Sequence, residues 1–187
     1  MDAVKTRLTV EEFIAQYPDH TRQIIEFIDG EVVIMPPPKD LHQYISFRLA
    51  LLIGNLVLSQ NLGEVRTAPS LVRMGDQLPE PDIFYVSKDN TSCVVAKDGY
   101  WQGAPDLCVE IISPGSGKHD RVTKFGIYQA HGVREYWIVD AEERFIEVWT
   151  LAGNQFQLHG KYAEGNQFTS TVLPALTITV SEIFPTA

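Results

Sequence analysis

The sequence predicts a mixed α/β fold, in which a central β-sheet of parallel and antiparallel strands is flanked by α-helices. Short β-rich runs recur along the 187-residue chain, and a long segment rich in Leu and Ile separates the first runs from the later ones. A strand–helix–strand pattern across residues 106–140 adds a parallel pair of strands. We find no internal repeat or long linker, so we expect residues 1–187 to form one domain.

The composition favours a soluble, cytoplasmic protein. Hydrophobic residues make up 44% and charged residues 21% of the chain, as in ordinary globular domains. No apolar run has the length of a membrane span, and the N-terminus lacks the apolar core of a signal peptide. Cys93 and Cys108 lack metal-motif spacing, and Cys108 is predicted to be a buried small hydrophobe. The formal charge of -9 argues against a broad basic surface for nucleic acid.

The first elements are a short helix and a hairpin. Residues 8–15 are helical in pattern, with Thr9 as the N-cap and Glu12 three residues later, as in a capping box. Residues 22–35 contain two β-rich runs separated by Asp29 and Gly30, a strong signal for a two-residue hairpin turn.

A long helix follows the hairpin. We expect Asp40 to cap it and the helix to run to about Gln60. Leu and Ile occupy most of its circumference, so we expect it to be substantially buried. Strands are then predicted at 64–74 and 82–86, and residues 87–103 form a long connection.

The second half alternates strands with one more helix. Residues 106–113 form a strand, 113–118 a flexible turn and 119–131 a helix, with Gly132 just past the helix end. Residues 135–140 and 145–149 are consecutive strands, expected to pair as a hairpin through 141–144. The tail adds strands near 155–158 and 176–180.

Glu110 is the most informative residue, because it lies in the middle of the apolar strand 106–113. An unpaired carboxylate in such a place costs several kcal/mol, so a cation, a proton or strong donors must compensate it. Asp82 opens another apolar run about thirty residues upstream. Two carboxylates on neighbouring strands suit a hard divalent cation such as Mg²⁺.

Lys124 lies on the helix after Glu110. Residues placed at about 100° intervals put it in one arc with Asp120, Ile127, Tyr128 and His131, on the face that should pack against the sheet. One interpretation is a lysine that extends along the apolar surface and pairs with Asp120. Its position after Glu110 favours a functional role.

His42 and Glu26 each allow two interpretations. His42 shares the inward face of its helix with Ile45, Leu49 and Ile53, so it is either a hydrogen-bonded core residue or a neighbour of the site. Glu26, on the first strand, is either an acid that supports the site or one partner of a structural salt bridge.

The chain resembles the restriction endonuclease-like branch of the PD-(D/E)XK nuclease superfamily, over nearly its whole length. Each matching piece is weak alone, but their ordered combination is specific. The pieces are Glu26–Pro38, His42, Pro81–Asp82, Val109–Pro114, Asp120, Lys124, Tyr128 and Gly132–Asp140. The superfamily pattern has a lysine two residues after the glutamate, where this chain has Ile112. The resemblance implies that Lys124 replaces it, with Lys118 as the weaker candidate.

The resemblance implies a restriction endonuclease-like fold and metal-dependent hydrolysis of DNA phosphodiester bonds. The metal would be Mg²⁺, with Mn²⁺ as a substitute, held by Asp82, Glu110 and the main-chain carbonyl of Ile111. Lys124 and His42 would complete the catalytic set. The alternative is a catalytically inactive module of this fold that binds DNA or a protein, which Ile112 and the acidic charge favour.

We also expect a homodimer, because cutting both DNA strands commonly requires two active sites related by a two-fold axis. The candidate interface residues are Tyr136, Trp137, Val148 and Trp149 on the later strands. Together with Trp101, the tryptophans are interpreted as core or interface aromatics.

Overall fold

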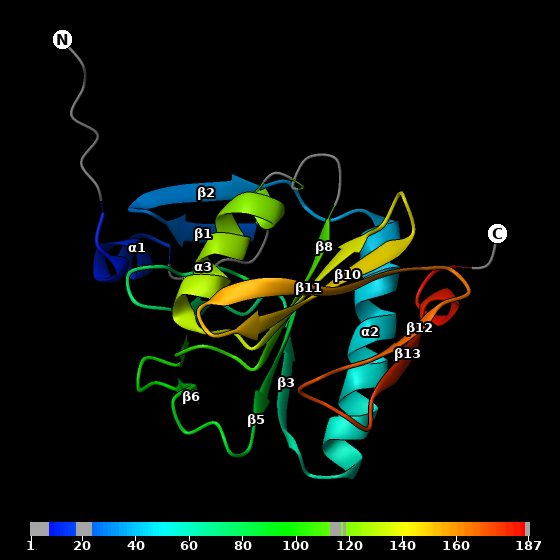
Figure 1. The fold of residues 1–187 in the computed structure, drawn as a ribbon. Helices are drawn as coiled ribbons and strands as arrows, with labels where there is room; N and C mark the ends of the chain where they lie inside the picture. Colours follow the sequence, from blue (N-terminus) through cyan, green and yellow to red (C-terminus); the bar gives the residue numbers. More distant parts are fainter. Residues whose placement is uncertain (1–7, 18–23, 113–116, 118, 186–187) are drawn as a thin grey trace.

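A six-stranded mixed sheet organises the chain, in a computed structural model that describes residues 8–17, 24–112, 117 and 119–185 (Figure 1). β8 and β9 are parallel, and every other neighbouring pair in this sheet is antiparallel. The predicted mixed α/β fold is therefore confirmed. In spatial order the strands are β11 (Gln155–Ala163), β10 (Phe145–Ala152), β9 (Glu135–Asp140), β8 (Leu107–Ile112), β5 (Ile83–Ser87) and β3 (Gly63–Thr67).

Helices cover both faces of this sheet. α2 (Asp40–Ser59) packs one stripe against the first face, through Ile45, Leu49, Ile53 and Val57. A π-helical turn (His119–Lys124) and α3 (Phe125–His131) cover the second face. Along β8, Leu107, Val109 and Ile111 join the α2 side of the core, whereas Cys108 and Ile112 join the α3 side. Alternation along the strand therefore directs Glu110 toward the π-helical turn and α3.

The N-terminal elements form a separate small layer. α1 (Val10–Gln16) has the predicted capping box between Thr9 and Glu12. β1 (Ile24–Ile28) and β2 (Glu31–Met35) form the predicted hairpin, and its turn residues have the positive φ angles that favour Asp-Gly, 52° at Asp29 and 79° at Gly30. Residues 22 and 23 of the predicted first strand lie outside the described residues. Phe27 and Leu78 exchange main-chain hydrogen bonds, which fix β1 beside the segment that leads into β5.

Two minor sheets complete the fold. One contains β4 (Val72–Arg73), β7 (Trp101–Gln102) and β6 (Val94–Val95), and the other pairs β12 (Gln167–Thr169) with β13 (Thr177–Thr179), followed by a short 3₁₀ turn at Val180–Glu182. The predicted single strand at 64–74 is therefore divided. β3 ends at Thr67, just before Pro69, which has no N–H to extend a ladder, and β4 joins another sheet.

Three predictions about exposure and capping were wrong. Lys39, and not Asp40, is the N-cap of α2, and its side chain makes no capping hydrogen bond. α2 is not substantially buried, because one stripe packs on the sheet while Phe47 and Leu58 on other sides are 66% and 74% exposed. Tyr136, Trp137 and Val148 are fully buried and cannot form a surface for a partner.

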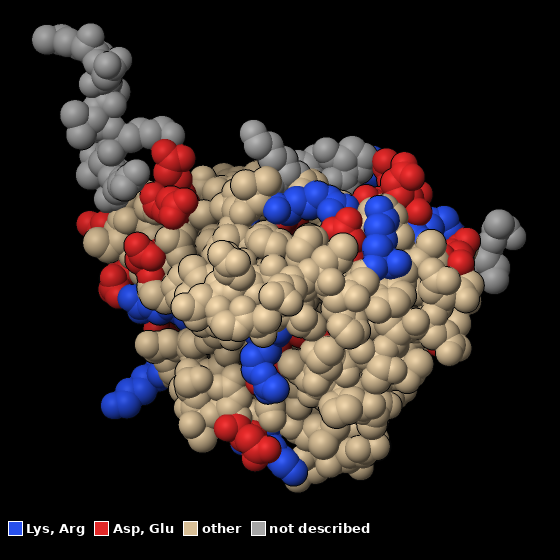
Figure 2. Space-filling view, viewed as in Figure 1, with Lys and Arg blue, Asp and Glu red and all other residues tan. Residues whose placement is uncertain are grey.

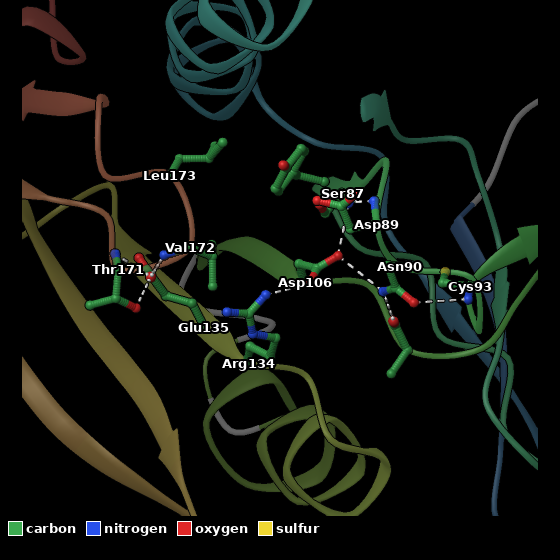
Figure 3. Close-up of polar contacts among 12 residues, drawn as sticks. Ser87, Asp89, Asn90, Cys93, Asp106, Arg134, Glu135, Thr171, Val172 and Leu173 are labelled. Atoms are coloured by element: carbon green, nitrogen blue, oxygen red, sulfur yellow. Dashed lines mark hydrogen bonds and ion pairs between the residues drawn. The ribbon is translucent and has the colours of Figure 1, made fainter. Parts of the chain in front are cut away.

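At the N-terminal ends of β8 and β9, two buried carboxylates have many donors (Figure 3). Asp106 accepts hydrogen bonds from the Ser87 N–H at 2.8 Å and from Asn90 Nδ2 at 3.0 Å, and it pairs with Arg134 at 2.9 Å. Glu135 is 0% exposed and accepts from Trp137 Nε1 at 2.6 Å, from the Thr171 N–H at 2.6 Å and hydroxyl, and from the Val172 N–H at 3.0 Å.

Candidate active site

Strand pairing brings Asp82 and Glu110 to the same part of the sheet. β5 and β8 are antiparallel with Ile83 opposite Val109, so Asp82, just before β5, lies beside Glu110 and Ile111 of β8. Asp82 Oδ2 accepts a hydrogen bond from the Ile111 N–H at 2.7 Å, which ties the end of β5 to β8. Both carboxylates are buried, at 8% and 2% exposure.

Lys124 reaches this site from the helical layer. Its Nζ lies 2.9 Å from Glu110 Oε1 and 2.8 Å from Glu26 Oε1, and it donates to the Glu80 carbonyl at 3.0 Å. Asp120, the i–4 residue, is farther, at 3.7 Å. The side chain is 4% exposed as a whole, so the ammonium is inside the protein and does not extend to solvent. The turn that carries it is π-helical, a rare geometry that recurs at functional sites.

Glu26 contacts Lys124 directly and is a member of the site. It is 0% exposed, and its Oε1 also accepts a hydrogen bond from the Glu80 N–H at 2.8 Å. Its Oε2 lies 2.7 Å from His119 Nε2. Burial raises the pKa of Glu26, but the charge of Lys124 and the donors at His119 and Lys124 outweigh burial and hold it below its usual value. The salt bridge expected for Glu26 exists, and its partner is the candidate catalytic lysine.

Glu80 was missed from the sequence. It lies just before Asp82 and is 3% exposed, and its Oε2 is buried without a hydrogen-bond partner among the described residues. Burial, together with the charge of Glu26, raises the pKa of Glu80 to about 7. The only available signal was the Pro-Glu-Pro-Asp sequence at 79–82, in which a charged residue directly precedes the buried strand.

His42 and Tyr128 contact the two predicted metal ligands. His42 Nε2 lies 3.1 Å from Asp82 Oδ2, so the histidine borders the site, as the resemblance implied. Its Nδ1 is buried without a partner in the described part of the chain. The hydroxyl of Tyr128 donates to Glu110 Oε1 at 2.6 Å. Lys118, the weaker substitute for the missing lysine, lies outside the described residues.

These side chains form one unit, which we call the carboxylate–lysine cluster. It contains Glu26, Glu80, Asp82, Glu110, Asp120 and Lys124. Burial raises the pKa of Glu110 well above its usual value, even though Lys124 opposes the shift. Burial lowers the pKa of Lys124, but the surrounding carboxylates outweigh it and raise that pKa well above the ordinary value. The lysine is therefore a permanent cation, and carboxylates exceed cations in the cluster.

The cluster suits a hard divalent cation. Its excess of buried carboxylate must hold protons or bind a cation, and carboxylate oxygens are the ligands that Mg²⁺ prefers. The hydrogen bonds that the Glu110 carboxylate accepts from other described residues all end at Oε1. Its Oε2 is therefore available to bind a cation. Within the described residues no group of three or more His, Cys, Asp or Glu side chains has the geometry of a metal site. Mg²⁺ does not need one, because it commonly uses one or two carboxylates and completes its shell with water and substrate phosphate.

The mixed sheet, the neighbouring carboxylates of Asp82 and Glu110 and the buried lysine are the features expected of a nuclease-fold protein. The family model "Putative restriction endonuclease" (Uma2) matches residues 10–181, so the chain belongs to this family. Membership of this family supports a nuclease function for the protein.

A crystal structure gives independent support for the fold. It is of a "putative nuclease belonging to DUF820" from Anabaena variabilis, it is similar to this chain with a TM-score of 0.77, and the two share 19% sequence identity. The similarity covers 95% of this chain and 97% of that one. No curated protein matches the sequence significantly.

Proposed function

We propose that this protein is a metal-dependent endodeoxyribonuclease that hydrolyses DNA phosphodiester bonds. The observation that carries the proposal is the burial of Lys124 against Glu110, near Asp82, in a chain of the restriction endonuclease family. A module that only binds would have no reason to retain so many buried carboxylates around one cation, because this arrangement destabilises the fold.

The residues divide the work as follows. Asp82 and Glu110, with the carbonyl of Ile111, would hold Mg²⁺, or Mn²⁺ in its place. When bound, the ion supplies Lewis-acid polarisation of the scissile phosphate and lowers the pKa of a water molecule. Lys124 remains protonated, so it orients water and stabilises charge on the phosphate and does not abstract a proton. His42 keeps the Asp82 carboxylate in place.

The structure also supports the substitution of Lys124 for the lysine missing at Ile112. Ile112 is 6% exposed and packs on the α3 side of the sheet, the same side as Glu110. A lysine at residue 112 would therefore approach the glutamate from its own strand, whereas Lys124 reaches it from the helical layer above. We expect the double variant Ile112→Lys with Lys124→Met to recover part of the activity lost in Lys124→Met alone.

A cleavage assay tests the proposal. Purified protein is incubated with supercoiled plasmid, linear duplex, single-stranded DNA and RNA, with Mg²⁺, Mn²⁺ or EDTA. We expect cleavage of DNA with either metal, none with EDTA, and none by Glu110→Gln. Glu142→Gln, on an exposed turn, is the matched control and should cut like the wild type.

The outcomes separate the two candidate functions. Cleavage by Glu110→Gln at the wild-type rate would contradict the assigned site, because the residue would then be dispensable. A wild-type chain that binds DNA but cuts no substrate with any divalent ion would instead establish the inactive module that Ile112 favours. Preferential cleavage of RNA would change the proposed substrate from DNA to RNA, and the proposed active site would stand.

A further inference from the structure

An apolar stripe on the outer face of α2 is exposed and does not belong to the core. Tyr44, Phe47, Leu51 and Leu58 are 39%, 66%, 42% and 74% exposed. With Gly54 they follow spacings of three and four residues in strict alternation, which is the heptad pattern of helix–helix packing. The stripe that packs on the sheet is different, since Ile45, Leu49, Ile53 and Val57 recur every four residues. One helix thus carries two apolar seams, and the described residues cover only one of them.

The outer stripe is also nearly free of charge. Between residues 41 and 59 the only Lys, Arg, Asp or Glu is Arg48, and its Nε donates to the Glu182 carbonyl at 2.8 Å. Figure 2 shows a largely uncharged area at the lower right, where α2 and the β12–β13 hairpin lie in Figure 1. For a chain with a formal charge of -9, this is a face on which an identical chain can approach without like-charge repulsion.

We propose that this stripe is the interface of a homodimer in which α2 packs against α2 of a second copy in the antiparallel direction. A two-fold axis near Leu51 places Leu51 against its own copy, Tyr44 near Leu58 and Phe47 near Gly54. A Cβ added at Gly54 would meet no atom within 4 Å, so the surface there is open to the Phe47 ring of the other chain. A parallel pair would instead place the Phe47 rings against each other and leave a gap at the glycines.

The size of the stripe indicates a reversible dimer. The four large side chains expose on the order of 400 Å² of apolar surface, as much as the largest patch on a typical monomer. A standard interface buries about 800 Å² on each partner. The helix pair alone is therefore the centre of a small interface, and we expect a dimer dissociation constant in the micromolar range.

A lipid surface fits the stripe less well than a second copy. α2 has the length and composition of a membrane-spanning helix, with 22% of its apolar window buried in the protein. However, one side of it is fixed to the sheet, and interfacial helices carry Lys and Arg along their polar flanks to attract anionic lipid. Arg48 is the only such residue between 41 and 59.

Sedimentation velocity from low micromolar to several hundred micromolar protein tests the surface. The wild type should shift from monomer to dimer, and Phe47→Glu should remain monomeric across the range. Leu158→Glu is the matched control, because it adds the same charge at a 51% exposed leucine on β11, and it should dimerise like the wild type. A wild type that stays monomeric, or a Phe47→Glu variant that dimerises normally, would overturn the proposal.

Cysteine crosslinking tests the direction of the pair. Under mild oxidation Leu51→Cys should form a disulfide-linked dimer, because a disulfide needs Cα atoms within about 7 Å. Leu58→Cys should not, because the antiparallel copies of residue 58 lie about 21 Å apart along the helices. Tyr44→Cys mixed with Leu58→Cys should crosslink. Efficient crosslinking of Leu58→Cys alone would establish a parallel pair and refute the antiparallel one.

Vesicle flotation tests the lipid alternative. The wild type should not bind phosphatidylcholine vesicles, with or without phosphatidylserine. If the wild type binds and Phe47→Glu does not, the stripe is a membrane-binding surface and the dimer proposal is wrong. None of these measurements uses cleavage, so their results are independent of the proposed nuclease activity.

Discussion

Two groups of buried carboxylates lie toward opposite ends of β8, and they differ in the donors that surround them. At the N-terminal ends of β8 and β9, Asp106 and Glu135 each accept several hydrogen bonds, from main-chain N–H groups, side-chain amide and indole nitrogens, a hydroxyl and Arg134 (Figure 3). Toward the C-terminal end of β8, Glu110 shares Lys124 with Glu26, and Glu80 has an oxygen with no partner among the described residues.

The difference separates structure from function. A buried carboxylate surrounded by fixed donors holds segments together, as Glu135 does for β9 and the Thr171–Val172 turn. A group of carboxylates with too few cations opposes folding unless a further cation supplies the missing charge, and we propose that a metal ion does so here. Burial alone therefore does not mark the site, because Glu135 and Glu26 are equally buried.

Lys124→Met should have the largest effect, because it removes the central cation of the carboxylate–lysine cluster. We expect the cleavage rate to fall by ~10²–10³, the usual loss for an electrostatic donor in catalysis. Stability at neutral pH should fall by about 3–5 kcal/mol, because buried carboxylates lose their partner. An ammonium lying on the surface would predict little change in stability. Chemical denaturation and single-turnover cleavage measure the two effects, with exposed Lys97→Met as the control.

Glu135→Gln should destabilise the fold by roughly 2–4 kcal/mol without acting on catalysis. The amide NH₂ of glutamine would face N–H donors at Trp137, Thr171 or Val172, whichever way it turned. Cleavage per folded molecule should be unchanged at a temperature well below the melting midpoint. A variant as stable as the wild type, measured by urea denaturation, would remove the structural role assigned to this carboxylate.

Glu80→Gln should stabilise the metal-free protein, and only at higher pH. The pKa of Glu80 is raised from 4.5 to about 7 in the folded state, so the folded protein binds this proton more tightly than the unfolded chain. The favourable contribution is present below pH 4.5 and is lost as pH rises to about 7. Above that pH the variant should be more stable by about 3 kcal/mol. Melting curves in EDTA across this window measure the difference, which should be near zero at pH 4.5. A difference independent of pH would contradict the assignment.

Tyr128→Phe should have the smallest effect. It removes the hydroxyl that donates to Glu110 at 2.6 Å and preserves the ring that packs in the core. We expect a loss of about 1–2 kcal/mol in stability and a decrease of less than about tenfold in cleavage. A decrease comparable to that of Lys124→Met would mean that the tyrosine participates in the chemistry directly.

Much of this architecture could be predicted from local sequence. The Thr9–Glu12 capping box, the Asp29–Gly30 turn and Gly132 after α3 are short-range signals, and the structure has all three. Asp82 and Glu110 were expected close together because one opens and the other lies within an apolar run, and the two runs were predicted to be neighbouring strands. The capping box, the turn and the helix end depend on residues a few positions apart.

The parts that could not be predicted depend on distant contacts. Glu26 reaches Lys124 because the β1–β2 hairpin docks beside the segment that leads into β5, and no local pattern reports docking. His131 was placed in the buried arc with Lys124, but it is the last residue of α3 and is exposed, whereas Ile127 and Tyr128 of that arc are buried. α2 was predicted to be substantially buried, outer stripe included, because apolar composition does not distinguish residues that pack in the core from residues exposed on the surface.

The carboxylate–lysine cluster draws on segments that are far apart in the chain. Glu26 is on a hairpin outside the main sheet, Glu110 is on a central strand, and Lys124 follows in the helical layer. During synthesis the site therefore cannot assemble until about two-thirds of the chain has left the ribosome. A truncated or partly made chain would carry the acidic residues without their lysine, so under the proposed mechanism it would not cut DNA.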